Sequence, residues 1–310
     1  MNSAISWSKS EHIKYRNISL ILKMEDKVSN NCVLKSNHGS FGGKVQFYSH
    51  ASIFTKTTMN FSIFLPPKDN EKKVPALIYL AGLTCTDETF MIKSGAQEYA
   101  SKHGVAIICP DTSPREAGVD GENRDWDFGT GAGFYLDAEK MPWAQNYKMY
   151  SYITKELIDI IDNNFDVDIN KIGIFGHSMG GHGALTIFLR NQNMFKSVSA
   201  FAPICNPMEC PWGKKAFTNY LGTEIEKWRS YDACELIAVN PTNVEILVDQ
   251  GLADAFLQEQ LHPNNFLQAC KNANVKLNLR QHEGYDHGYY FISTFIADHI
   301  EHHAKILNAL

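Results

Sequence analysis

The chain has 310 residues, with 29 Lys and Arg against 34 Asp and Glu, so its formal net charge is −5. Hydrophobic residues make up 44% of the sequence, which is enough to bury a sizeable core and excludes disorder as the main state of the chain. The mild acidity gives no reason to expect nucleic acid or an anionic membrane as a partner.

Three features of the sequence bear on where the protein works. The longest uncharged apolar stretch, residues 172–189, contains five glycines, which suits a strand, a turn and a helix better than a membrane span. The first 27 residues carry acidic and basic side chains and lack the apolar core of a secretory signal. The seven cysteines are odd in number and include no CxxC pair, so free thiols in a reducing compartment are expected. Together these features predict a cytoplasmic protein without a membrane span.

The pattern of apolar residues predicts an α/β fold. Residues 1–30 are polar and weakly patterned, and we expect a flexible N-terminal extension followed by a single domain of residues 31–310. The predicted strands, in chain order, are 44–48, 60–65, 74–80, 105–109, 171–175, 197–202, 244–248 and 275–279. The predicted helices are 92–103, 147–165, 180–190, 263–271 and 289–307. Such alternation is typical of a mostly parallel central sheet with helices on both faces.

The sharpest chemical signal is Gly-His-Ser-Met-Gly at residues 176–180, which fits G-x-S-x-G and stands between a predicted strand and a predicted helix. The serine of such a motif sits on a strained turn, and the flanking glycines avoid a clash where the chain comes close to itself. The helix N-terminus that follows favours developing negative charge. Ser178 is therefore the predicted nucleophile, and the alternative is a chance glycine-rich turn.

A serine nucleophile needs a histidine base oriented by a carboxylate, and in this architecture the chain order is Ser, acid, His. His287 lies in a turn-rich loop between the last predicted strand and the last predicted helix, where it can reach over the sheet edge. The acid should follow the strand at 244–248. Spacing favours Asp254 only slightly over Asp249, and both stay open. Asp286 is less suited, because side chains of adjacent residues tend to diverge.

An oxyanion hole requires two preorganised N–H donors. One should be the backbone N–H of Met179, which follows the nucleophile. The other should come from the loop after strand 74–80, where the N–H of Leu83 is the candidate. The HGGG motif of lipases is absent from this loop.

Several other segments have distinctive sequences: GLTCT at 82–86, PDTSPR at 110–115, WDFGTGAGFY at 126–135, GHSMGGHGAL at 176–185, FAPICNP at 201–207, CPWGKKAF at 210–217, DQG at 249–251 and GYDH at 284–287. These segments resemble motifs of the S-formylglutathione hydrolase (esterase D) family in the α/β-hydrolase superfamily. The resemblance extends over about residues 31–307. It implies an α/β-hydrolase fold and puts the acid on Asp254 and the base on His287.

The resemblance also implies an activity. It indicates a cytoplasmic serine thioesterase that hydrolyses S-formylglutathione to formate and glutathione, with side activity on small esters. It implies no cofactor and no metal, and it implies a homodimer. A general short-chain carboxylesterase is the alternative, because it would use the same machinery.

Weaker signals lie around these motifs. Cys85 and Trp212 are predicted to lie next to the site, and the aromatic residues of 126–143 are either walls of the acyl pocket or core. The polar side chains Arg115, Lys214, Lys215, His299, His302 and His303 are expected on solvated surfaces, although the three cations could attract the glutathione carboxylates.

Overall fold

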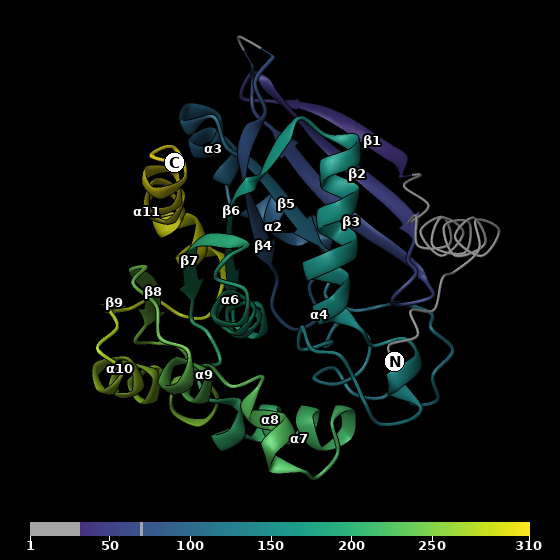
Figure 1. The fold of residues 1–310 in the computed structure, drawn as a ribbon, viewed down its shortest axis with the longest axis vertical. Coiled ribbons are helices and arrows are strands. Elements are labelled where there is room, and N and C mark those ends of the chain that lie inside the picture. Colours follow the sequence, from purple (N-terminus) through teal and green to yellow (C-terminus); the bar gives the residue numbers. More distant parts are fainter. Residues whose placement is uncertain (1–31, 69–70) are drawn as a thin grey trace, which may run out of the picture.

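The computed structural model describes residues 32–68 and 71–310, so the predicted extension of residues 1–30 lies outside the described part. The described chain forms a nine-stranded sheet in the order β1-β2-β3-β5-β4-β6-β7-β8-β9 (Figure 1). The strands are β1 Val33–Ser40, β2 Gly43–Ala51, β3 Thr58–Leu65, β4 Val74–Leu80, β5 Ala106–Pro110, β6 Val167–His177, β7 Phe195–Phe201, β8 Ile246–Gly251 and β9 Leu277–His282. The helices are α2 Asp87–Lys93, α3 Ala96–His103, α4 Met149–Ser151, α5 Leu157–Asn164, α6 Met179–Arg190, α7 Pro211–Tyr220, α8 Ile225–Arg229, α9 Ala233–Val239, α10 Pro263–Asn272 and α11 Tyr289–Leu307. The predicted α/β class is confirmed.

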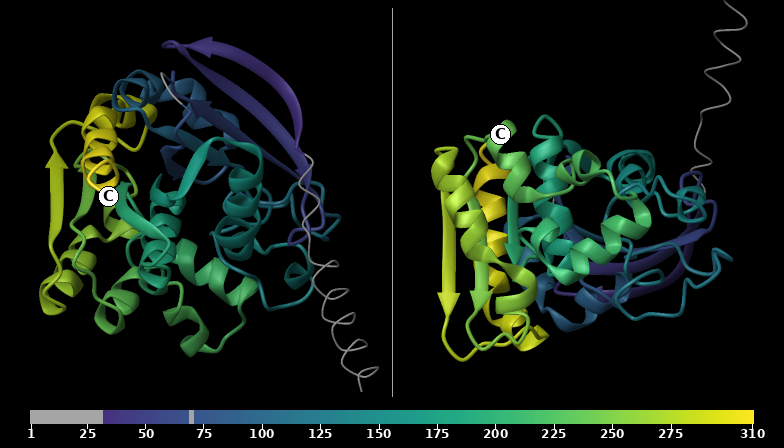
Figure 2. Two further views of the ribbon diagram at one scale, coloured as in Figure 1. Left: turned by 45° about the horizontal axis from the view of Figure 1, so that its top comes forward. Right: turned by 90° about the horizontal axis from the view of Figure 1, so that it is seen from below.

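Strands β4 to β9 pair in parallel, whereas β1, β2 and β3 form an antiparallel extension that joins the sheet through β5. The outer strands β1 and β9 lie at opposite ends of the sheet (Figure 2). The carboxyl ends of the parallel strands all meet one edge of the sheet, which is where ligands bind in open α/β sheets. Strand β1 was not among the predicted strands, because it is largely exposed and its sequence lacks an apolar alternation.

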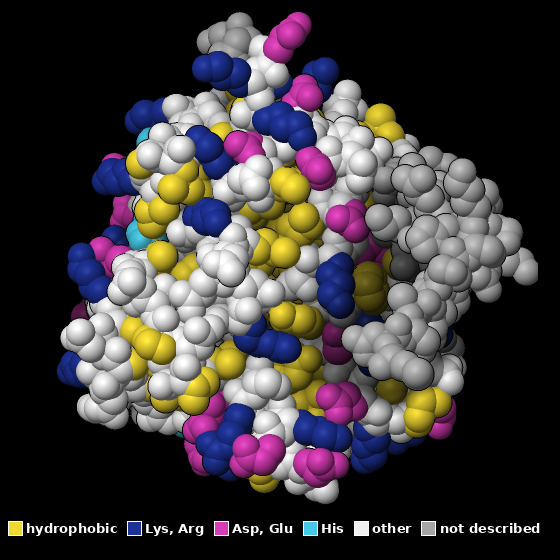
Figure 3. All heavy atoms as spheres, in the orientation of Figure 1, with side chains coloured by type: hydrophobic (Ala, Val, Ile, Leu, Met, Phe, Trp, Pro, Cys, Tyr) yellow, Lys and Arg dark blue, Asp and Glu magenta, His cyan; other side chains and the backbone are white. Residues whose placement is uncertain are grey.

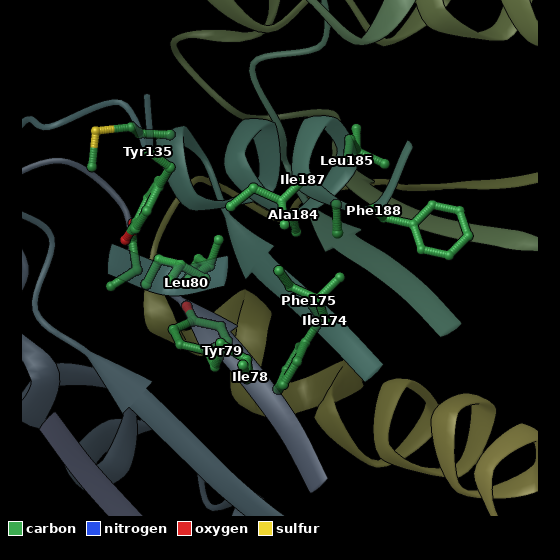
Figure 4. Packing of buried hydrophobic residues seen from close by; sticks show 14 of the residues in the cluster. Ile78, Tyr79, Leu80, Tyr135, Ile174, Phe175, Ala184, Leu185, Ile187 and Phe188 are labelled. Atoms are coloured by element: carbon green, nitrogen blue, oxygen red, sulfur yellow. The ribbon is translucent and has the colours of Figure 1, made fainter. Parts of the chain in front are cut away.

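The core lies on both faces of the parallel strands. Helix α6 lies across β4, β6 and β7 on one face, and every residue from its start to Leu189 is buried (Figure 4). Helix α11 covers the other face together with α3. Alternate residues of β6 point to opposite faces, so Phe175 lies 5.4 Å from the ring of His303 on α11, while Ile174 points the other way.

Some predicted helices differ from those observed. The predicted helix 92–103 is observed from residue 96 onward as α3 and ends before Gly104 as predicted, but its start is wrong, because residues 87–93 form a separate helix, α2. Thr86 caps the start of α2 with its side chain and forms a capping box with Thr89, and Gly95, with φ of +69°, turns the chain before α3. The predicted helix 147–165 is observed as α4 and α5, joined by a π-helical segment, Tyr152–Glu156.

Two histidines of α11 also differ from expectation. His299 and His303 were expected on a solvated face, but both are completely buried. His303 bonds to Ser197 and Ser199 of β7, at 2.6 and 2.8 Å, and His299 also contacts Ser199, at 2.8 Å. The expectation was wrong because these polar side chains satisfy one another between the helix and the sheet.

The surface of the described residues mixes charges of both signs. On the face seen in Figure 3, Lys and Arg side chains alternate with Asp and Glu side chains. Among the described residues, no helix is both long enough and apolar enough to cross a membrane.

Candidate active site

The nucleophile motif forms a sharp turn between β6 and α6. Ser178 has φ of +58° and ψ of −119°, a conformation that non-glycine residues rarely adopt, and it is 3% exposed. Its N–H donates to the carbonyl of Phe201 on β7, 3.0 Å away, and its own carbonyl accepts from His182 and Ile204. These backbone bonds hold the strained residue in place at the carboxyl edge of the sheet.

The two glycines of the motif are required by space. A Cβ added to Gly176 would collide with the carbonyl group of Gly180, and one added to Gly180 would collide with the carbonyl group of Leu80 at the end of β4. The turn therefore packs directly against the strand that leads to the predicted oxyanion loop, as the clash argument from the sequence expects.

Asp254 and His287 lie together at the same edge. His287 Nδ1 is 2.6 Å from Asp254 Oδ2, and the Asp254 carboxylate also accepts from the Phe256 N–H at 2.8 Å and from the Gln250 side chain at 3.3 Å. The Asp254 side chain is fully buried. An imidazole that donates from Nδ1 presents Nε2 as an acceptor. The Asp286 carboxylate accepts from the N–H of Gly288, at 2.8 Å.

Asp249, the other candidate acid, belongs to a separate cluster. Arg280 forms a bidentate ion pair with its carboxylate, at 2.6 and 2.5 Å, and His299 lies 3.2 Å from it. Burial alone would raise the pKa of Asp249, but the hydrogen bonds and charges of His299 and Arg280 hold it well below its usual range. Asp249 lies on β8, Arg280 on β9 and His299 on α11, and among the described residues Asp249 makes no hydrogen bond or ion pair with His287.

The residue before the nucleophile lies against the predicted base. The ring centroid of His177 is 4.4 Å from that of His287, and His177 is 5% exposed. Burial, together with the neighbouring His287, lowers the pKa of His177 well below its ordinary value, against the opposing effect of the His287 carbonyl. His177 is therefore neutral and does not oppose the formation of a cation on His287 by charge repulsion.

The loop after β4 is held by hydrogen bonds from distant segments. Thr84, with φ of +69°, donates from its N–H to the Gly131 carbonyl at 2.9 Å. The Cys85 carbonyl accepts from the Thr112 hydroxyl at 2.6 Å and from the Arg115 guanidinium at 3.1 Å.

The two predicted oxyanion donors are free. Within residues 32–68 and 71–310, the N–H groups of Leu83 and Met179 have no protein acceptor, and Met179 stands at the first position of α6, where the helix offers none.

A small cavity of about 120 Å³ lies between the nucleophile turn, the loop after β4 and the loop of His287. Its lining residues come from the nucleophile turn, the loop after β4, the His287 loop and three aromatic side chains: Gly82, Leu83, Cys85, Trp126, His177, Ser178, Trp212, Phe256 and His287. Three larger surface hollows of about 450–630 Å³ contain none of the predicted site residues. The small cavity is thus where Ser178, His287 and Leu83 meet.

The family of the chain follows from sequence and structure comparison. The family described as "Putative esterase" matches residues 52–302. The S-formylglutathione hydrolase of Rattus norvegicus is 54% identical over 276 residues, which cover 88% of this chain and 98% of the rat protein. The chain belongs to the S-formylglutathione hydrolase family.

Two other members of the S-formylglutathione hydrolase family support this membership. That of Arabidopsis thaliana is 54% identical and covers 86% of this chain and 95% of its own. A solved S-formylglutathione hydrolase from Agrobacterium tumefaciens matches with a TM-score of 0.86 and 47% identity, over 88% of this chain and 99% of that chain. The resemblance read from the sequence motifs is confirmed.

The aromatic residues of the long loop, together with Trp212, divide between the cavity and the core. Trp126 and Trp212 line the cavity, whereas Phe128 and Trp143 pack around Tyr220 in the interior. Of the aromatic residues in 126–143, Trp126 thus forms a wall of the cavity, whereas Phe128 and Trp143 belong to the core.

Cys85 lines the same cavity as Ser178 and His287. Burial raises the pKa of its thiol, so it is protonated at neutral pH and unsuited to act as a second nucleophile. Within the described residues, no three His, Cys, Asp or Glu side chains are grouped so that they could hold a metal ion.

Two of the cations expected on the solvated surface have structural partners. Arg115 forms a bidentate pair with the buried carboxylate of Asp111, at 2.7 and 2.8 Å. Lys215 lies 2.9 Å from Asp125 and 2.5 Å from Asp127. Both side chains stay about one third exposed, so they lie at the surface as expected, but each is neutralised there by carboxylates. Asp111 stands four residues before Arg115, whereas Asp125 and Asp127 stand far before Lys215 in the chain. Lys214 is half exposed, as expected.

Proposed function

We propose that the chain is a serine thioesterase that hydrolyses S-formylglutathione to formate and glutathione and also cleaves small esters. Its relatives named S-formylglutathione hydrolase are 54% identical over most of its length. The observation that carries the proposal is the position of His287, which is 2.6 Å from Asp254 and lines the same small cavity as Ser178. In this proposal Ser178 is the nucleophile, His287 the general base and Asp254 the residue that orients it.

The first half of the reaction acylates the serine. The Ser178 hydroxyl attacks the formyl carbonyl carbon while His287 Nε2 takes the hydroxyl proton. Asp254 keeps the imidazole in the tautomer that accepts at Nε2 and stabilises the imidazolium. The oxygen of the tetrahedral intermediate binds the N–H groups of Leu83 and Met179. The carbon–sulfur bond then breaks, and His287 returns its proton to the departing glutathione sulfur.

The second half releases formate. A water molecule gives a proton to His287 and attacks the formyl carbon, and the same two N–H groups bind the second oxyanion. The bond to Ser178 Oγ breaks and the hydroxyl regains its proton from His287. Because the formyl group carries only hydrogen, a cavity of about 120 Å³ suits this acyl group better than a bulky one.

Hydrolysis of S-formylglutathione by the purified protein, followed as loss of the thioester and compared with Ser178→Ala, tests the proposal. We expect a kcat/KM well above that for p-nitrophenyl acetate, and loss of both activities in the variant. Turnover of p-nitrophenyl acetate with little turnover of S-formylglutathione would instead establish a general short-chain carboxylesterase.

The setting of the enzyme is part of the same proposal. We infer a cytoplasmic homodimer in which residues 31–310 form one domain. The seven cysteines fit a reducing compartment, and six of them are free thiols in the described part of the chain: Cys85, Cys109, Cys205, Cys210, Cys234 and Cys270. Light scattering on the eluting protein measures the mass of the assembly, and a monomer at all concentrations would contradict the homodimer.

A further inference from the structure

The cavity is too small for the whole substrate of the proposed function, on which this inference rests. Pockets that enclose a small molecule usually measure about 300–1,000 Å³, whereas this cavity measures about 120 Å³. The formyl thioester end fits inside, and the glutathione tripeptide must then lie across the rim. A residue that distinguishes S-formylglutathione from a simple ester should therefore be an exposed residue at this rim.

Trp126 is the one lining residue of the cavity that is mainly exposed, at 57%. Its ring meets Trp212 edge-on, with centroids 5.6 Å apart and an interplanar angle of 90°. Trp212 packs on Phe256 at 4.8 Å, and Phe256 packs on His287 at 5.0 Å. A continuous row of aromatic rings thus runs from the exposed indole to the predicted base.

Lys215 of α7 holds the segment that presents Trp126. Its ammonium lies 2.9 Å from Asp125 and 2.5 Å from Asp127, the two residues that flank the tryptophan. Asp125 and Phe128 form a β-bridge across the turn, and Phe128 is buried. The indole is therefore exposed while the backbone that carries it is fixed on both sides, so it is preorganised as a contact surface.

The ion pairs also affect charge at the rim. Glutathione carries two carboxylates, and Asp125 and Asp127 would repel them. Lys215 contacts both aspartates and offsets their charge. Loss of its ammonium would leave two unpaired acids beside the path of the tripeptide.

We propose that the exposed indole of Trp126 is the contact for the peptide part of glutathione, with Lys215 as the positioning residue that holds it over the cavity. The planar amides of the tripeptide pack on the ring face, while the edge of the ring stays on Trp212. The contact lies outside the small cavity, so it selects for the leaving thiol and not for the acyl group.

The test measures kcat and KM for S-formylglutathione and for p-nitrophenyl acetate in Trp126→Ala and Lys215→Met. Inhibition of p-nitrophenyl acetate hydrolysis by S-methylglutathione reports the peptide contact without the chemical step. We expect the KM for S-formylglutathione and the inhibition constant of S-methylglutathione to rise about tenfold in Trp126→Ala, with kcat changed much less. Lys215→Met should show a smaller rise of the same kind.

Three controls keep the result interpretable. Trp126→Phe and Lys215→Arg should recover most of the affinity for S-formylglutathione and S-methylglutathione. Phe41→Ala removes an equally exposed aromatic residue that does not line the cavity, and it should leave kcat and KM unchanged for both substrates. An unchanged inhibition constant in Trp126→Ala, or an equal loss with both substrates, would overturn the inference. Failure of the wild-type protein to hydrolyse S-formylglutathione would instead overturn the proposed function.

Discussion

Arg115 donates to the backbone carbonyl of Cys85, 3.1 Å away, across thirty positions of the sequence. The guanidinium is fixed by its bidentate pair with Asp111, which is itself buried. The Thr112 hydroxyl donates to the same carbonyl. The loop that carries the Leu83 N–H is therefore held at the Cys85 carbonyl by Arg115 and Thr112, and Asp111 in turn fixes Arg115.

Replacing Arg115 by Lys should slow the proposed reaction without abolishing it. A lysine keeps the charge beside Asp111 but lacks the planar fork that bonds the carboxylate and the Cys85 carbonyl together. We expect kcat to fall up to about tenfold, with KM nearly unchanged, because a misplaced oxyanion donor affects the transition state more than the ground state. Steady-state kinetics measures the split, and Thr112→Val is the matched variant at the same carbonyl. An increase in KM alone would contradict this role.

Replacing Asp254 by Asn should leave the fold intact and remove most of the activity. The new amide can donate from its NH2 group to Nδ1 of His287, which moves the ring proton to Nε2, so the ring loses the tautomer that presents Nε2 as a base. We expect kcat to fall by about 10³–10⁴-fold, with a melting temperature close to that of the wild-type protein. Stopped assays with p-nitrophenyl acetate are sensitive enough for such residual rates.

Asp249→Asn is the matched control, since spacing alone did not separate the two aspartates. Removal of this buried charge breaks the bidentate pair, but Arg280 is partly exposed and keeps its ion pair with Asp298, so we expect a loss of about 1–3 kcal/mol in the free energy of unfolding. The folded fraction should keep its activity. If Asp249→Asn lost activity while folded and Asp254→Asn did not, Asp249 would be the orienting acid.

The sequence predicted what local patterns can report. The alternation of apolar segments gave the parallel strands, and the spacing around Ser178 gave its turn. The burial of His299 and His303 was missed because it depends on Ser197 and Ser199, about a hundred positions earlier. The sequence did contain a signal for this burial. Ser197 and Ser199 lie on one face of a buried strand, and buried hydroxyl groups require hydrogen-bond partners from the helix packed over them.

The partners of two cations were also missed. Lys215 binds Asp125 and Asp127 of the long loop, which stand so much earlier in the chain that no local pattern reveals the pairing. Arg115 and Asp111 are four residues apart, but they lie in an irregular loop and not in a helix, so this spacing did not indicate a pair. Spacing alone left the acid open between Asp249 and Asp254 because both stand near the end of β8, and only the family resemblance favoured Asp254. Only the path of the chain after Gly251 decides which carboxylate turns toward His287.

Replacing Gly180 by Ala should destabilise the protein and disturb the site together. The new Cβ would collide with the carbonyl of Leu80 and approach that of Ala81, where the loop after β4 begins. Neither backbone group can move without shifting this loop, so we expect a loss of about 1–3 kcal/mol in the free energy of unfolding and a marked fall in kcat. Chemical denaturation and the esterase assay measure the two effects. Gly222→Ala, where nothing lies within 4 Å of the new Cβ, controls for the substitution, although its positive φ adds local strain.

Asp87 should make the stability of the protein fall as the pH rises. It is 5% exposed at the start of α2, and burial, then the charges of Asp111 and Glu88, raise its pKa to about 7, against the opposing charge of Arg115. Between about pH 4 and pH 7 the folded state therefore holds a proton that the unfolded state has released, and the stability from this group is lost as the pH rises through that window. Asp87→Asn removes the titration. We expect the variant to gain stability relative to the wild-type protein between pH 4.5 and pH 8, by at most about 4 kcal/mol. Urea unfolding of both proteins across this range measures the difference, and a difference that does not change with pH would show that Asp87 is ionised throughout.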